Sequence, residues 1–137
     1  MNKGGCPEIR LKRIYDPPEE IDGFRVLVDR LWPRGLKKEK ANIDYWAREL
    51  APSHSLRKEF HRDWNFDRFR ELYLQELNDP NKAEEWRRIL EQADGRPITF
   101  LYARRDRMQN HAVVLKKWAE AKTAQEKGTL QRGPFRG

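Results

Sequence analysis

The stretch Pro97-Ile98-Thr99-Phe100-Leu101-Tyr102-Ala103 is the strongest structural signal in this chain of 137 residues. It is an almost continuous apolar run, preceded by the turn signal Asp94-Gly95 and followed by charged residues. An apolar run without alternation is typical of a strand covered on both faces, the usual state of strands in parallel sheets. We therefore predict that this segment is the central strand of a sheet.

Two further strands are predicted near the N-terminus. Residues 8–15 alternate between polar and apolar side chains, as in an edge strand, and residues 24–31 form a more apolar strand. The segment 16–23 joins them and contains the turn signals Asp16-Pro17-Pro18 and Asp22-Gly23. A parallel crossover needs roughly a dozen residues or more. The two strands are therefore either an antiparallel hairpin or not neighbours.

Apolar residues at helical spacing predict helices between the second and third strands and after the third. The first would be capped by Asn42 and end at Pro52, with an inward face of Ile43, Trp46, Ala47 and Leu50. The next three would bury Leu56 and Phe60; Phe66, Phe69, Tyr73 and Leu77; and Ala83, Trp86, Ile89, Leu90 and Ala93. The last begins near Asn110 and would bury Val114, Leu115 and Trp118.

The long helical segment before the third strand allows a right-handed parallel crossover. The expected fold is α/β, with a small, partly parallel sheet of three to four strands packed with about five helices. Residues 1–121 are predicted to form a single α/β domain, and residues 122–137 a basic, flexible tail.

Composition favours a folded, basic protein. The chain has 29 basic and 22 acidic residues, and 37% of its residues are charged, a level also found in disordered chains. Its aromatic content, which includes five tryptophans, argues for a packed core. The net charge of +7 favours phosphate-rich partners. Residues 122–137 carry a net charge of +3, so nearly half of this excess belongs to the predicted tail.

Several classes of function are disfavoured. Cys6 is the single cysteine, so no internal disulfide forms. The first residues lack an apolar signal region and no segment is long enough to span a membrane, so we expect a cytoplasmic protein without a membrane partner. His54, His61 and His111 are not at metal-ligand spacing, and no glycine-rich phosphate loop occurs. No metal and no cofactor are therefore predicted.

Ligands of parallel sheets usually bind beyond the carboxyl ends of the strands, where two polar segments are predicted. The first runs from Asp29 to Gly35 and includes two arginines that can grip an anion, Arg30 and Arg34, as well as Trp32. Alternatively, Asp29 forms a structural ion pair that ties this loop down, with Trp32 as a core residue.

The second polar segment runs from Arg104 to His111 and precedes a helix whose N-terminus presents free N–H groups to an anion. Asn110 is either the N-cap of this helix or a ligand-binding residue. His111 lies on the inward face, as a hydrogen-bonded core residue or as a proton carrier. The arginines of this segment are most simply explained as a solvated loop.

Weaker candidates lie in the helical region. Ser53-His54-Ser55 brings serine and histidine together, but a catalytic triad also needs an orienting acid. Trp64, Phe66 and Phe69 can stack with bases, although their spacing favours a core. The consecutive helices around 56–60 and 66–77 allow a helix-turn-helix reader, but their charges are mixed in sign.

Several stretches resemble one family. They are Arg25 to Gly35, Ala51 to Phe60, Leu101-Tyr102-Ala103 and Asn110 to Leu115, and they are similar to the YeaO-like proteins of the domain of unknown function numbered 488. The resemblance covers residues 8–119 and implies a compact α/β domain with no agreed activity. Longer members of the wider family carry a cysteine–histidine pair where this chain has Asn110-His111, so thiol chemistry does not carry over.

The leading hypothesis is a site for a small anionic or phosphorylated ligand at the carboxyl edge of the sheet. The resemblance favours the same residues as the site but implies no role for any of them. From the chemistry of their side chains, Asp29 and His111 are the catalytic candidates, and Arg30, Trp32, Arg34 and Asn110 would bind the ligand. A hydrolase or a transferase is the expected class of any enzyme. The alternatives are a nucleic-acid-binding protein that uses the tail and its arginines, and an interaction module without catalysis.

Overall fold

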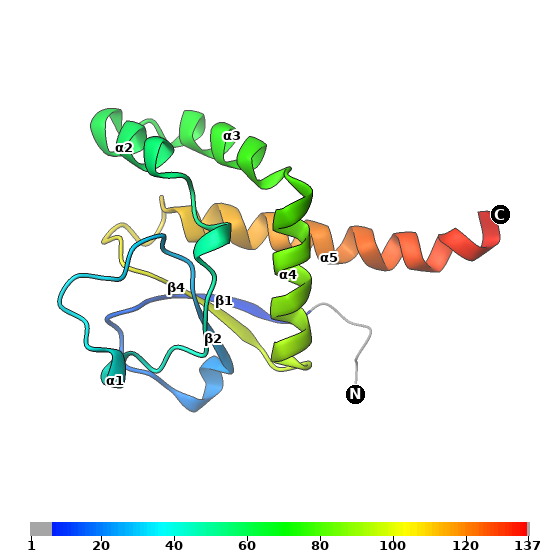
Figure 1. Cartoon of the computed structure of the whole chain (residues 1–137), viewed down its shortest axis with the longest axis horizontal. Helices are drawn as coiled ribbons and strands as arrows, with labels where there is room; N and C mark the ends of the chain where they lie inside the picture. The colour runs from blue at the N-terminus through cyan, green and yellow to red at the C-terminus, as the bar shows by residue number, and fades with distance from the viewer. Residues whose placement is uncertain (1–6, 137) are drawn as a thin grey trace.

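The computed structural model describes residues 7–136, with the side chains described as far as Gln125. Its centre is a four-stranded sheet in the order β1-β4-β2-β3, in which all neighbouring strands are parallel (Figure 1). The strands are β1 (Ile9–Arg13), β2 (Phe24–Leu27), β3 (Tyr45–Trp46) and β4 (Ile98–Tyr102). The predicted α/β class is confirmed, and the sheet is parallel throughout.

The predicted central strand is confirmed as β4. It lies between β1 and β2, and all five of its residues are buried. Phe100 pairs with Leu11 on one side and with Val26 on the other. The strands β1 and β2 are therefore not neighbours, which was the second of the two predicted arrangements. Residues 14–23 return the chain to the start of β2 through the short 3-10 helix η1 (Glu20–Asp22).

The two faces of the sheet are covered differently. One face carries the main core, built with side chains from the long helices. The other has a small cluster of Ile14, Leu27 and Leu101, covered by the loop segment that holds Trp32 and Leu36. Helices thus dominate one face, and a loop covers the other.

The five α-helices are α1 (Lys38–Ala41), α2 (His54–Asp63), α3 (Phe66–Leu77), α4 (Pro80–Ala93) and α5 (His111–Arg136). Most of the predicted apolar stripes of α3 and α4 are buried, as are Leu56 and Phe60 of α2, whereas Phe66, Ala83 and Leu90 are only partly buried. Helix α5 packs on β1, β4 and α3 and continues past α4 (Figure 1). It extends through the predicted tail to Arg136. Because the side chains beyond Gln125 and all of Gly137 lie outside the description, the flexible tail stays a prediction.

The predicted helix over residues 43–50 is wrong. Tyr45 and Trp46 pair with β2 as the edge strand β3, and the 3-10 helix η2 (Arg48–Leu50) follows. Asn42 ends α1 in the left-handed conformation instead of capping a new helix. The apolar spacing was compatible with a helix, but the backbone of this segment pairs with the open edge of β2 instead. Tertiary context overrides helix propensity in this segment.

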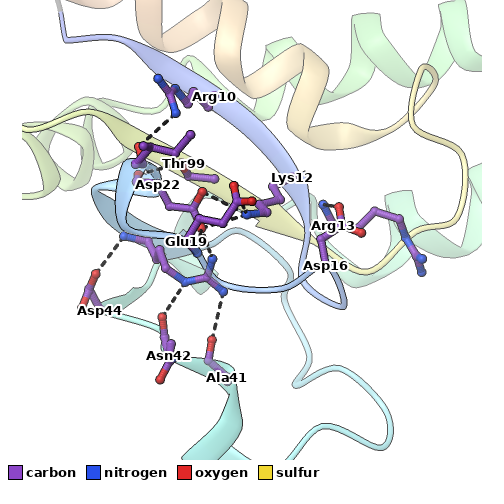
Figure 2. Close-up of polar contacts among 12 residues, drawn as sticks. Arg10, Lys12, Arg13, Asp16, Glu19, Asp22, Ala41, Asn42, Asp44 and Thr99 are labelled. Atoms are coloured by element: carbon purple, nitrogen blue, oxygen red, sulfur yellow. Dashed lines mark hydrogen bonds and ion pairs between the residues drawn. The ribbon is translucent and has the colours of Figure 1, made fainter.

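A buried polar network holds together the end of the sheet where the strands begin (Figure 2). The Arg25 guanidinium lies 2.6 Å from the Asp22 carboxylate and also donates to the carbonyls of Asn42 and Ala41. The Lys12 ammonium lies 3.0 Å from the same carboxylate. Burial alone would raise the pKa of Asp22, but hydrogen bonds from the Glu19 N–H, Lys12 and Arg25 outweigh it and lower that pKa. The network links β1, η1, β2 and α1.

Replacing Asp22 with asparagine should destabilise the protein by about 3 to 5 kcal/mol, because the buried Arg25 loses its counter-charge. The Asp22 pKa is lowered on folding, so its contribution is present above the unfolded value of 3.8 and is lost as the pH falls through the lower folded value. We expect the free energies of unfolding of the wild type and of Asp22→Asn to differ less at a pH below 3.8 than at neutral pH. Urea unfolding of both proteins at the two pH values measures this difference.

The control for this experiment is Asp16→Asn. The Asp16 pKa is also lowered, chiefly by a hydrogen bond from Arg107, but both side chains are partly exposed. Removing that surface pair should cost about 0 to 1 kcal/mol. A loss for Asp22→Asn no larger than for Asp16→Asn would contradict the structural role of the network.

Gly23 is required by a close backbone approach. Its φ is 68°, and an added Cβ would lie 2.2 Å from the carbonyl oxygen of Pro97. Gly23→Ala should therefore destabilise the fold by about 3 kcal/mol, since a backbone atom cannot move aside. Gly95→Ala, at a φ of 85° with open space around it, should cost only about 1 kcal/mol. Equal losses in chemical denaturation would contradict this explanation.

Candidate functional site

A cleft of about 960 Å³ lies beyond the carboxyl ends of β2 and β4. Its lining includes Asp29 and Arg30 after β2, Ala103 and Arg104 after β4, and His111 at the start of α5. Small-molecule sites usually occupy roughly 300 to 1,000 Å³. The two polar segments predicted to meet at this edge of the sheet are therefore brought together around a ligand-sized space.

Asp29 and His111 meet at the cleft. The His111 Nε2 atom lies 2.9 Å from the Asp29 Oδ1 atom, and both side chains are largely buried. The two side chains are therefore each other's polar partners, and among the described residues neither of these two atoms has a further hydrogen-bond partner. The other carboxylate oxygen of Asp29 accepts a hydrogen bond from the Ala103 N–H. The pair is thus anchored to the end of β4 and keeps hydrogen-bonding capacity at the cleft.

Two of the predicted ligand-binding residues have clear structural partners near this pair. Arg30 lines the cleft, but its guanidinium donates to the carbonyls of Pro52 and Ala51. Asn110 is fully buried, and its side-chain oxygen caps α5 by accepting from the Val113 N–H. Of the two predicted roles of Asn110, the structure shows that of the N-cap of α5.

The structure places Trp32 and Arg34 away from the cleft. The Trp32 ring packs against Trp46 at 5.4 Å, and its N–H donates to the carbonyl of Leu36. The Arg34 side chain is exposed, and its backbone carbonyl accepts from the Tyr15 hydroxyl. Both residues hold the loop that covers the second face of the sheet. Neither residue lines the cleft.

One face of α2 forms a basic wall of the cleft. Five residues at helical spacing line it, here called the α2 stripe: His54, Arg57, Lys58, His61 and Arg62. The acidic Glu59 of the same helix points elsewhere, to an ion pair at 3.0 Å with Arg68 of α3. In the part of the chain that the structure describes, Arg57 and Lys58 form no ion pair. The charges of α2 are therefore sorted by face, with the positive ones at the cleft.

Aromatic rings form the apolar part of the cleft. Phe60 and Phe69 are buried and stacked at 4.4 Å, which confirms a core role for Phe69. Trp64 is 59% exposed and also lines the cleft. The Arg104 guanidinium lies 4.3 Å from the Phe60 ring centre and 4.7 Å from that of Trp64. Burial lowers the pKa of Arg104, but an arginine stays charged at neutral pH.

The remaining candidates are structural in this fold. The Ser53 hydroxyl caps α2 and donates to the Glu76 carboxylate at 2.5 Å. Within the range 7–125, no group of three or more histidine, cysteine, aspartate or glutamate residues is arranged to hold a metal. The cleft lining in the described structure also contains no serine, threonine, cysteine or tyrosine that could act as a nucleophile. Among the described helices, none is long and apolar enough to cross a membrane.

Residues 8–134 match a family model described as the inactive DUF488-N3 subclade. The chain belongs to the DUF488 family. It is 47% identical over 111 residues to the uncharacterised protein YeaO of Escherichia coli K12, a match that covers 80% of this chain and 95% of that protein. The uncharacterised protein Rv3073c of Mycobacterium tuberculosis H37Rv is 36% identical over 108 residues, or 78% of this chain and 89% of that protein. No solved structure matches the chain.

Sequence reasoning did not identify the α2 stripe as part of the site. The signal was present, because His54, Arg57 and Lys58, and His61 and Arg62 recur at the spacing of one helix face. The sequence of this helix contains both acidic and basic residues, and counting them together does not reveal that the basic ones share one face. A helical projection of residues 54–63 would have revealed the stripe.

The crowded cations of the stripe should cost stability. We expect the double substitution Arg57→Gln/Lys58→Gln to raise the free energy of unfolding by up to about 0.5 kcal/mol at low salt, because it removes like-charge repulsion in the N-terminal half of a helix. The gain should shrink as salt screens the charges. Urea unfolding at low and high ionic strength measures both effects. A clear loss of stability would show that these side chains support the fold.

Proposed function

We propose that this protein binds a small anionic, phosphorylated ligand in the cleft beyond the carboxyl ends of β2 and β4. One observation carries the proposal: six arginine and lysine side chains line this cleft, together with all three histidines of the chain, against the carboxylates of Asp29 and Asp106. Like charges that gather in a concave site raise the local concentration of anions. Phosphate groups are the anions that arginine binds best in such an arrangement.

The acidic residues of the cleft do not cancel this charge. The Asp106 carboxylate accepts hydrogen bonds from the N–H groups of Met108 and Gln109, which lower its pKa and tie it to its own loop. Asp29 is held by Ala103 and lies against His111. The two acids therefore offset only part of the positive charge of the six cations, and Arg57 and Lys58 have no acidic partner within the described structure.

A binding role is favoured over catalysis. The Asp29–His111 pair can orient a ligand or transfer a proton, but the described lining supplies no hydroxyl or thiol nucleophile next to it. The matched subclade is itself described as inactive. Under this proposal, His111 contacts the bound anion and Asp29 holds the imidazole in place. The second candidate function is a hydrolase or a transferase that uses this pair as the proton carrier, with water as the nucleophile in the first case and an acceptor substrate in the second.

Isothermal titration with inorganic pyrophosphate tests the proposal. The wild-type protein should bind it, and Arg57→Gln/Lys58→Gln should weaken binding by about tenfold or more, since charge-assisted hydrogen bonds each contribute about 1.5 to 3 kcal/mol. His111→Gln should also weaken binding. The control is Lys40→Gln/Lys117→Gln, which removes the same charge at two exposed positions outside the cleft.

The control separates a site from a general charge effect. Equal weakening by the two double variants would mean that only the net charge matters, and no saturable binding to the wild type would overturn the proposal. Incubation of the same proteins with phosphoryl and acyl ester substrates tests catalysis. Turnover that disappears in Asp29→Asn and in His111→Gln would establish an enzyme and overturn the purely binding role.

A further inference from the structure

Trp64 has an unusual backbone conformation at the end of α2. It ends α2 with φ at 57°, in the left-handed region, where a non-glycine residue costs about 1 kcal/mol or more. Glycine or asparagine is the common choice at such a position. The side chain nevertheless stays 59% exposed, so burial does not account for the choice of a large ring here. A large ring presented to a cleft is instead typical of a surface that a ligand covers.

The Trp64 ring is held in a fixed position. It meets the edge of the Phe60 ring at 6.2 Å, with an interplanar angle of 62°. The Arg104 guanidinium lies over both rings, and its Nε donates to the carbonyl of Gln109. His61 lies 5.6 Å from the Trp64 ring. An indole that is fixed and still largely exposed is suited to stack on a flat aromatic group, and the neighbouring arginine strengthens such stacking.

The Trp64 ring follows the cations of the α2 stripe along the chain, and both line the same cleft. The α2 stripe begins at His54 and ends at Arg62, two residues before Trp64. Eight residues of helix span about 12 Å, so the stripe offers room for a sugar and its phosphates beside the ring. A phosphorylated sugar without a flat base would leave the Trp64 ring without a stacking partner. A flat base joined to phosphates would cover Trp64 and reach the cations at the same time.

We propose that the anion of this cleft is a nucleotide, whose base stacks on Trp64 beside Arg104 and whose phosphates lie along the α2 stripe. This inference rests on the proposed function and adds the chemical class of the ligand. The nucleotide unit is either free or part of a single strand, because both present the same base and phosphate groups. The Asp29–His111 pair lies in the lining of the same cleft.

Isothermal titration with ADP and with inorganic pyrophosphate tests the contribution of the base. The wild-type protein should bind ADP about tenfold tighter than pyrophosphate, the usual contribution of one stacked base. Trp64→Asn should abolish this preference; the ratio of the two affinities is the readout, because Trp64 also contacts Arg104 of the anion site. Asparagine tolerates the left-handed backbone, so the fold is retained. Trp64→Phe, which keeps an aromatic ring, should preserve most of the preference.

Tyr15→Asn is the matched control, because this aromatic side chain is 44% exposed and lies outside the cleft. It should leave both affinities unchanged. If the wild type binds ADP and pyrophosphate equally, or if Trp64→Asn keeps the preference for ADP, the nucleotide inference is overturned while the anion site stands. If neither ADP nor pyrophosphate binds to the wild type, both proposals fail.

The source of the nucleotide is resolved with a single-stranded oligodeoxyadenylate and an abasic strand of the same length. The site is assigned to a nucleic-acid strand if the oligodeoxyadenylate binds more tightly than ADP. This tighter binding should also be lost in Trp64→Asn, and the affinity should fall steeply with salt. Binding of ADP at least as tight as that of the strand assigns it to a free nucleotide. Equal binding of both strands, together with no preference for ADP, overturns the role of the base.

Discussion

The parallel pairing of β4 on both of its edges is the constraint on which the rest of the structure depends. An apolar strand in the middle of a sheet must satisfy its N–H and C=O groups with neighbours on two sides, and β1 and β2 supply them. Because all strands run the same way, their carboxyl ends share one edge of the sheet. The chain leaves this edge as loops, and the side chains of these loops line the cleft. The buried Asp22–Arg25 pair holds the opposite end (Figure 2).

The cleft concentrates features that a stable fold would avoid. Cations gather on one face of α2, a tryptophan ring is exposed in the left-handed conformation, and a largely buried histidine lies against a carboxylate. Each feature has a small cost to the stability of the fold. Local conflicts of this kind cluster at functional sites, because a ligand supplies the missing contacts there. The rigid sheet edge lets the fold tolerate them together.

The helices show where local pattern is a sufficient guide. Periodicity identified α3 from its stripe of Phe69, Tyr73 and Leu77, and α4 from its stripe of Trp86 and Ile89. Each helix also begins at a residue whose side chain caps it. Residues 43–50 have the same spacing but became β3 and a 3-10 turn. There the open edge of β2 offered hydrogen bonds to Tyr45 and Trp46, and no local signal reports that opportunity.

By itself, the sequence determined the central strand, the long helices, the parallel crossover and the two polar loops that border the cleft. These depend on periodicity and turn residues, which act over a few positions. Only the tertiary structure decided that Asp29 and His111 touch, that Arg34 faces away, and that the α2 stripe and Trp64 complete the wall. Such contacts join residues far apart in the chain, and the packing of helices on the sheet selects which face of each helix meets the cleft.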